Sequence, residues 1–319
     1  KITQMMMVDF RQWKTADDEA KSDFTKMNSE VQKIVEDYDF GSVIFFANNI
    51  KETEQSFDLT MDLQKAATKD NGIPLLITTD QEGGIVYRLG SGTALPGNMA
   101  LGATGDVNNA KIAGEIIGSE LSSLGINTTL APVVDVNNNA NNPVIGLRSY
   151  GEDAEMVGKM ASAEIEGLAE YNVIGCAKHF PGHGDTATDS HYGLPMVDKS
   201  KEELLNNELK PYQVAINQGI EMIMSAHILY PQLDDTTVYS EQTKKQEKLP
   251  STLSHKILTN LLKEEMGFKG VVVTDAMNMA GIAATYDEVQ AVKLAINAGV
   301  DLICMPTNIT CLEDMSKLD

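Results

Sequence analysis

Three of the five histidines in the chain lie in one segment, KHFPGHGDTATDSHYGLP at Lys178–Pro195, together with two aspartates and one lysine. Imidazole and carboxylate groups held side by side can carry out general acid/base catalysis or bind a metal ion. Gly182, Gly184 and Pro181 disfavour a regular helix here, so the segment is predicted to be a loop of defined shape.

Three roles for this loop stay open from the residues alone. His191 paired with Asp189 or Asp185 would serve proton transfer. A metal site is less favoured, because His179 and His183 are not predicted to lie on a helix and their spacing matches no standard ligand pattern. A loop that only makes hydrogen bonds is also less favoured, because polar clusters of this density seldom serve packing alone.

Polar residues also follow apolar runs elsewhere in the chain. Directly or closely after such runs come Asp80, Asp135, Lys178, His227 and Asp275. The segment NPVIGLRSYGED after Asp135 adds Arg148. Taken alone, Asp275 could cap the helix that follows it, and His227 is better interpreted as a hydrogen-bonded core histidine. Convergence of these residues on one face of a fold would favour a functional site.

The apolar runs belong to a repeating pattern. A helical stretch ends at Gly or Asn, residues that accept a left-handed turn, and a short β-branched or apolar run follows. The clear runs are Ser42–Phe46, Ile73–Thr79, Ile126–Val134, Val173–Ala177, Ile220–Ser225, Val271–Thr274 and Val300–Met305. Met5–Val8 is predicted as one more strand at the N-terminal end. Nearly continuous hydrophobicity indicates strands that are covered on both faces.

Eight strands that alternate with helices predict an α/β fold, a parallel (β/α)8 TIM-type barrel over residues 1–319 as a single catalytic domain. A doubly wound open sheet is the alternative, but no GxGxxG motif follows the first strand. The carboxyl ends of barrel strands meet at one rim, which would bring the polar residues together. Only Pro306–Asp319 follows the last strand, which leaves room for a further C-terminal domain outside this sequence.

Composition narrows the class of partner. The chain has 46 Asp and Glu against 25 Lys and Arg, which gives a net charge of −21. This charge argues against nucleic acid as a binding partner and against binding to an anionic membrane surface. No apolar run approaches the roughly 18 residues of a membrane span. Three scattered cysteines predict no disulfide framework. The chain starts at Lys1, which favours a trimmed envelope or extracellular protein, with the cytoplasm as the alternative.

The sequence resembles glycoside hydrolase family 3 and its β-N-acetylglucosaminidase branch in the order and spacing of four motifs. These motifs are DQEGG at Asp80–Gly84, NPVIGLRSYGED, the loop at Lys178–Pro195 and GVVVTDAMNM. The resemblance spans the chain from Ser42 to Pro306. It implies a retaining exo-glycosidase that removes terminal, non-reducing β-linked N-acetylglucosamine from cell-wall muropeptides or chitooligosaccharides. The implied partner is therefore a small carbohydrate, and no metal or other cofactor is implied. The oligomeric state stays open.

The same resemblance implies roles for individual residues. Asp275 would be the nucleophile, and His191, oriented by Asp189, would be the acid/base. The residues implied to bind the sugar are Asp80, Arg88, Arg148, Lys178, His179 and His183. An imidazole donor suits this chemistry, because it carries a proton near neutral pH without strong desolvation. Two alternatives remain: a phosphorylase of the same fold, and a sugar-binding protein that has lost catalysis.

Overall fold

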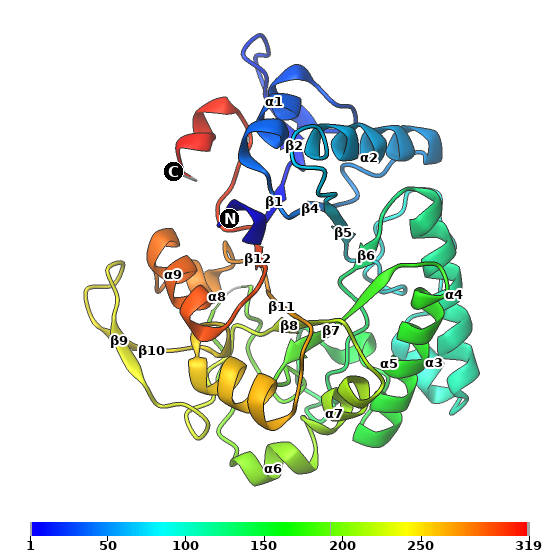
Figure 1. The fold of residues 1–319 in the computed structure, drawn as a ribbon. Helices are drawn as coiled ribbons and strands as arrows, with labels where there is room; N and C mark the ends of the chain where they lie inside the picture. The colour runs from blue at the N-terminus through cyan, green and yellow to red at the C-terminus, as the bar shows by residue number, and fades with distance from the viewer. Residues whose placement is uncertain (1, 192, 318–319) are drawn as a thin grey trace.

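The apolar runs form a ring of parallel strands in the computed structural model, which describes residues 2–191 and 193–317 (Figure 1). The strands of the ring are β1 (Met6–Asp9), β4 (Ser42–Phe45), β5 (Leu76–Thr79), β6 (Thr128–Thr129), β7 (Ile174–Phe180), β8 (Met222–Ser225), β11 (Val271–Thr274) and β12 (Ile303–Cys304). Their order is β11-β8-β7-β6-β5-β4-β1-β12. A parallel bridge between Val273 and Leu302 joins the two ends of this sheet. The barrel prediction is confirmed, and the open-sheet alternative is wrong.

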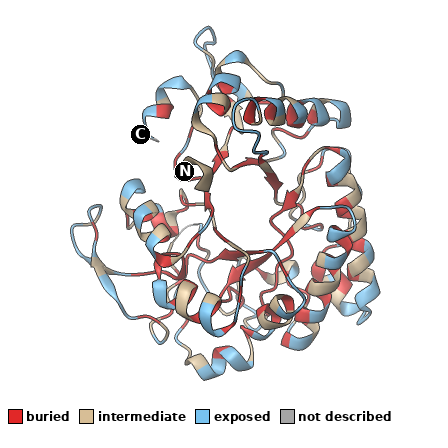
Figure 2. Ribbon diagram, viewed as in Figure 1, coloured by how far each residue is buried: buried red, intermediate tan, exposed pale blue. Residues whose placement is uncertain are grey.

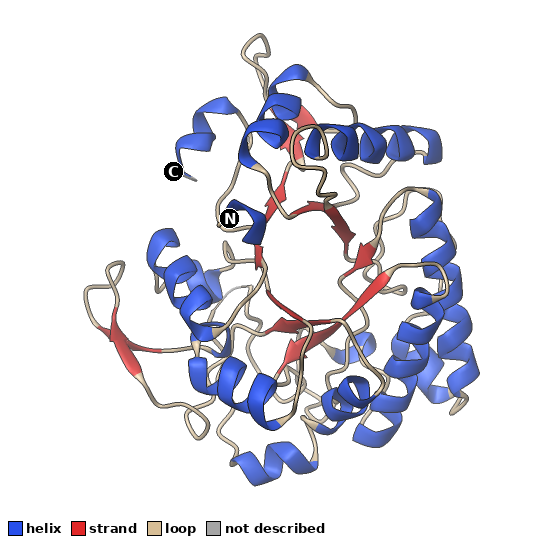
Figure 3. Cartoon of the chain, viewed as in Figure 1, coloured by secondary structure: helices blue, strands red, loops and turns tan. Residues whose placement is uncertain are grey.

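Helices cover the outside of the ring, as Figure 3 shows. They are α1 (Ser29–Tyr38), α2 (Thr53–Ala67), α3 (Asn98–Ala103), α4 (Val107–Ser123), α5 (Ala154–Ala169), α6 (Lys201–Asn206), α7 (Lys210–Asn217), a π-helix (Lys256–Glu265), α8 (Ala280–Ala283) and α9 (Glu288–Ala298). Short 3-10 turns lie at Thr3–Met5, Gly146–Arg148, Ser251–Leu253 and Leu312–Lys317. Two small antiparallel pairs, β2 (Gln12–Trp13) with β3 (Ser22–Asp23) and β9 (Thr237–Tyr239) with β10 (Gln246–Lys248), lie outside the ring.

Two strands differ from the sequence prediction in ways that matter for the site. β6 is much shorter than the predicted run, because Pro132 has no N–H to donate to a sheet. β7 extends beyond Ala177 to Phe180 and therefore contains Lys178 and His179. Neighbouring residues of a regular strand point to opposite faces, but the register of β7 against β8 shifts between Ala177 and Phe180. This irregularity lets both side chains reach the same rim.

The strands of the ring are largely buried, as Figure 2 shows, and the barrel interior below that rim is apolar. Its side chains include Met7, Ile44, Cys176, Met222 and Val273. Cys176 is a free, fully buried thiol, as expected for a small core residue, and burial raises its pKa. The polar residues at the strand ends therefore stand on a packed floor that holds their backbones in place.

One carboxyl group is buried in the helical layer, where α4 packs against α5. Glu164, on α5, accepts a hydrogen bond from the Tyr150 hydroxyl through Oε2, while its Oε1 has no partner among the described residues. The helices α4 and α5 pack so closely that a Cβ at Gly114 would lie 2.1 Å from the Glu164 carbonyl oxygen. Burial raises the pKa of Glu164 to about 7, although the bond from Tyr150 opposes this.

The buried Glu164 predicts a measurable pH dependence of stability. Between about pH 4.5, the ordinary pKa, and pH 7 the folded state holds one more proton than the unfolded state, so stability falls as pH rises through this window. Glu164→Gln should remove that slope, on the order of a few kcal/mol over the window. Denaturant unfolding at several pH values measures it. The control is Glu166→Gln, an exposed residue of the same helix, and equal slopes in the two variants would contradict the assignment.

Candidate active site

The polar strand ends surround a cavity of about 150 Å³. Its walls are formed by Asp80, Glu82, Val86, Arg88, Val144, Arg148, Lys178, His179, His183, Ser190, His191, Met224 and Asp275. All the residues predicted as site residues lie in this wall except Asp189, which is bonded to the ring of His191. A neighbouring chamber of about 310 Å³ continues toward β1, β4 and β12 and shares Asp80, Arg88, His191, Met224 and Asp275 with the cavity.

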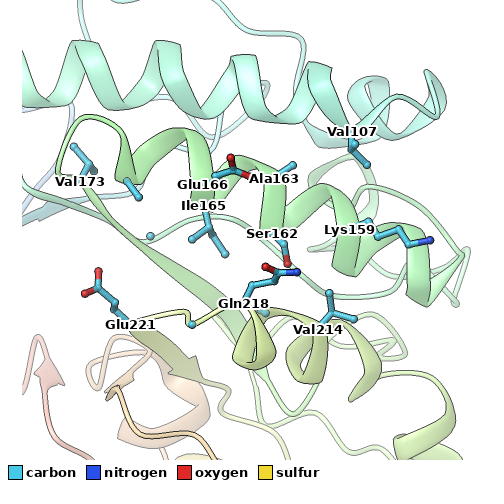
Figure 4. A pocket seen from close by; sticks show the side chains of 14 residues that line it. Val107, Lys159, Ser162, Ala163, Ile165, Glu166, Val173, Val214, Gln218 and Glu221 are labelled. Carbon is cyan, nitrogen blue, oxygen red and sulfur yellow. The ribbon is translucent and has the colours of Figure 1, made fainter.

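A larger cavity of about 650 Å³ lies elsewhere, between α5 and α7 and beside the starts of β7 and β8. Figure 4 shows Ser162 and Gln218 facing each other across it, with aliphatic side chains such as Ile165 and Val214 around them. Its described lining includes no histidine. Of its two carboxylates, Glu166 forms a surface ion pair with Lys111, and Glu221 lies at the other end of the cavity, beside the start of β8. The convergence of titratable groups therefore marks the smaller cavity as the candidate active site.

A buried carboxylate holds two cations at the cavity wall. Arg148 donates through Nε and Nη2 to the two oxygens of Glu82, each at 2.8 Å. Lys178 Nζ lies 2.6 Å from Glu82 Oε1 and 2.8 Å from Asp80 Oδ1. The side chains of Glu82 and Lys178 are only 2% and 3% exposed, so water screens these pairs weakly.

The ion pairs also fix the ionisation of the wall. Burial acts to raise the pKa of Glu82, but the charges of Lys178 and Arg148 hold that pKa well below its ordinary range. Burial acts to lower the pKa of Lys178, but the carboxylates of Asp80 and Glu82 raise it above its ordinary value. Glu82 likewise raises the pKa of Arg148 against the effect of burial. The wall therefore offers charged donors at neutral pH to a ligand rich in hydroxyl groups.

Asp135 orients the ring of His179. Its Oδ2 lies 2.8 Å from His179 Nδ1, and its Oδ1 accepts the backbone N–H of His183 at 2.6 Å. Asp135 is 1% exposed and is inaccessible to a ligand. With Nδ1 bound to a carboxylate, the His179 ring presents Nε2 to the cavity.

The partner of His191 is Asp189, one of the two aspartates that the sequence left open. The ring Nδ1 of His191 lies 2.7 Å from Asp189 Oδ1, which also accepts the His191 backbone N–H at 2.9 Å. Asp185 instead forms an ion pair with Lys199 at 2.6 Å. Burial acts to raise the pKa of Asp189, but the bonds from His191 lower it overall. The His191 side chain is 54% exposed, and its Nε2 is left for a ligand.

Asp275 follows β11 directly, and its Oδ1 accepts the backbone N–H of Ala276 at 2.8 Å. Burial acts to raise its pKa, but the imidazoles of His227 and His179 and the Ala276 amide together lower it, so the carboxylate is ionised at neutral pH. His227 itself is fully buried, with Nδ1 2.9 Å from Thr252 Oγ1 and Nε2 3.0 Å from the Ala276 carbonyl. It is a hydrogen-bonded core histidine, as interpreted from the sequence.

Two predicted sugar-binding residues differ in what they offer a ligand. The nitrogens of His183 lie 2.7 Å from Thr186 Oγ1 and 3.1 Å from Ser190 Oγ, so the loop itself uses both. Arg88 has its guanidinium carbon 6.0 Å from the centre of the Phe46 ring. The Arg88 Nε is buried and has no hydrogen-bond partner among the described residues. Arg88 is therefore the freer of the two to bind a ligand.

Sequence reasoning missed the positioning role of two acidic residues, Glu82 and Asp135. Glu82 lies two residues after Asp80 in DQEGG, and an acidic residue so close to a strand end could have been predicted as part of the site. Asp135 follows an apolar run in the same way as Asp80 and Asp275. Their partners Arg148 and His179 are 66 and 44 residues away in the chain, and no local pattern pairs residues at such separations.

Within residues 2–191 and 193–317, no group of three or more His, Cys, Asp or Glu side chains is arranged to hold a metal ion. No helix in the described part of the chain has both the length and the apolar character to cross a membrane.

Comparison with known proteins gives consistent matches. The family described as "Glycosyl hydrolase family 3 N terminal domain" matches residues 1–318. A beta-hexosaminidase A from Pseudoalteromonas piscicida is 41% identical over 330 positions, which cover 100% of this chain and 55% of that protein. A beta-hexosaminidase from Haemophilus influenzae is 34% identical over 82% of this chain and 71% of its own length.

Solved structures agree. A glycoside hydrolase family 3 beta-N-acetylglucosaminidase from Paenibacillus sp. matches with a TM-score of 0.87 and 39% identity, over 99% of this chain and 55% of that one. NagZ from Neisseria gonorrhoeae in complex with N-trifluoroacetyl-D-glucosamine matches with a TM-score of 0.78 and 28% identity, over 98% of this chain and 82% of that one. The chain thus spans about half the length of the first relatives that it matches.

Proposed function

Because the chain belongs to glycosyl hydrolase family 3, we propose that it is a retaining exo-β-N-acetylglucosaminidase that releases terminal, non-reducing β-linked N-acetylglucosamine. The observation that carries the proposal is that Asp275, at the end of β11, and His191, in the loop after β7, line one small cavity. A retaining glycosidase needs a carboxylate and a proton donor on either side of one sugar. The sugar is inferred from relatives that are named hexosaminidases and N-acetylglucosaminidases.

Asp275 is the proposed nucleophile. Its carboxylate attacks the anomeric carbon, and an ester between the sugar and Asp275 forms as the glycosidic bond breaks. The bond from the Ala276 amide fixes Oδ1 and leaves Oδ2 for attack. The lowered pKa of Asp275 supports this role, because an ionised carboxylate is the attacking species.

His191 is the proposed acid/base. Its Nε2 donates a proton to the leaving oxygen in the first step and removes one from the attacking water in the second, which frees Asp275. Asp189 holds the opposite ring nitrogen and stabilises the imidazolium, as the aspartate of a catalytic triad does. The half-exposed position of His191 gives the leaving group and the water a path to Nε2.

The wall opposite these groups is proposed to bind the non-reducing end of the sugar. Asp80 accepts bonds from hydroxyl groups, while Lys178 and Arg148 donate to others. All three groups are already ion-paired, with Lys178 buried and Asp80 and Arg148 half-buried, so binding requires little rearrangement. A cavity of about 150 Å³ supports the release of one sugar at a time. Muropeptide fragments and chitooligosaccharides are the proposed substrates.

Product analysis tests the proposal. In phosphate buffer the protein should release free N-acetylglucosamine from 4-nitrophenyl β-N-acetylglucosaminide and from N,N'-diacetylchitobiose. Asp275→Ala should abolish this release without loss of the folded state. The control is Asp198→Ala, which changes an exposed residue just after the Lys178–Pro195 loop and should keep full activity. Sugar 1-phosphate as the main product would establish phosphorolysis instead. Binding of N-acetylglucosamine without any turnover would establish a sugar-binding protein.

His191→Ala should act selectively on leaving groups. We expect kcat/KM to fall about 100-fold or more on an alkyl or methylphenyl glycoside and far less on the nitrophenyl glycoside, because a basic leaving oxygen depends most on a proton donor. The value of kcat/KM reports the first chemical step and is the quantity to compare. Equal losses on both substrates would show that another group donates the proton.

A further inference from the structure

Ser190 is the buried anchor of an otherwise exposed loop tip. Ala187, Thr188 and His191 are exposed, whereas Ser190, which lies between the two members of the His191–Asp189 pair, is only 2% exposed. Whatever fixes Ser190 in place therefore also restrains the backbone that carries the neighbouring imidazole and carboxylate, since adjacent Cα atoms are about 3.8 Å apart.

Among the described residues, two hydrogen bonds hold Ser190, and they come from different parts of the barrel. Its Oγ lies 3.1 Å from Nε2 of His183, a residue in the wall of the candidate active-site cavity. Its carbonyl oxygen accepts the backbone N–H of Gly281, on α8 after the strand of Asp275, at 3.1 Å. The contact with α8 is close, because a Cβ at Gly281 would lie 3.0 Å from this carbonyl oxygen and 3.2 Å from His227 Cβ.

The bond to His183 has a defined direction. The Thr186 hydroxyl donates to the His183 carbonyl at 3.0 Å, so the 2.7 Å contact between Thr186 and the ring is donated by His183 Nδ1. Burial lowers the pKa of His183 to about 4, so at neutral pH its Nε2 is an acceptor for the Ser190 hydroxyl. A side chain at position 190 without a donor leaves this buried nitrogen unpaired.

The start of the loop is anchored separately. Lys199 bridges Asp185 at 2.6 Å and the buried Glu208 at 2.5 Å, and Glu208 also accepts from Asn138 at 2.7 Å. This anchor lies before the exposed tip, so it fixes the root of the loop while the position of the tip depends on Ser190.

We propose that Ser190 is a positioning residue that holds the His191–Asp189 pair over the cavity by joining His183 to Gly281. The inference rests on the proposed function, because it concerns the acid/base of that reaction. Ser190 joins three parts of the site: the sugar-binding wall, the segment that follows the nucleophile and the proton donor. Its role is in the placement of His191, not in the ionisation of His191, because the bond to Asp189 does not involve the Ser190 side chain.

Ser190→Ala tests this role. We expect kcat/KM to fall about five- to tenfold on a methylphenyl N-acetylglucosaminide, as for the loss of one hydrogen bond, and much less on the nitrophenyl substrate. The pH profile should keep its shape, because the bond between His191 and Asp189 remains. Thr188→Ala is the matched control, since it removes a hydroxyl from an exposed position of the same loop, and it should leave both substrates unaffected.

Gly281→Ala perturbs the same contact from the other side. Its new methyl group pushes on the Ser190 carbonyl, so the same selective loss is expected, with a melting temperature near that of the unmodified protein. Equal losses on both substrates, or no loss in either variant, would overturn the role of Ser190. Absence of turnover in the unmodified protein would instead overturn the proposed function, so the two failures are distinguishable.

Discussion

The site depends on a buried carboxylate whose two oxygens are already bound to cations of the protein. Glu82 lies in the wall of the cavity and binds Arg148 through two hydrogen bonds and Lys178 through an ion pair. Removal of one partner from a buried pair typically costs about 3–5 kcal/mol, because the other charge is left uncompensated. Loss of any one of these three side chains is therefore expected to destabilise the other two. The arrangement brings residues from three segments of the chain to one wall and keeps their charges balanced before any ligand binds.

The two proposed reacting groups lie on different kinds of structure, one at the end of a core strand and the other in an exposed loop. Asp275 stands at the end of a barrel strand and is bonded to the next backbone amide, so its position is fixed by the core. His191 stands on an exposed loop tip and depends on Ser190 for its place. This division suits the proposed double-displacement reaction, in which the nucleophile stays at one carbon while the acid/base serves first a leaving group and then a water molecule.

The repeat of glycine, apolar run and polar residue was enough to predict the barrel and the rim at which Asp80, Lys178 and Asp275 meet. Local pattern could not show that β7 continues through His179, because the register shift depends on its pairing with β8. It also left the partner of His191 open between two aspartates of one loop. That choice depends on Lys199, which binds Asp185 from outside the loop. Such choices are made by tertiary contacts and by burial, which sequence spacing does not encode.

The most direct test of the account is to find the carboxylate that carries the sugar during turnover. A fluorinated N-acetylglucosaminyl donor with a good leaving group slows the second step and traps the glycosyl-enzyme. After proteolysis, mass spectrometry should find one sugar per chain on the peptide that contains Asp275. A stoichiometric burst of leaving group with the label on any other residue would contradict the account.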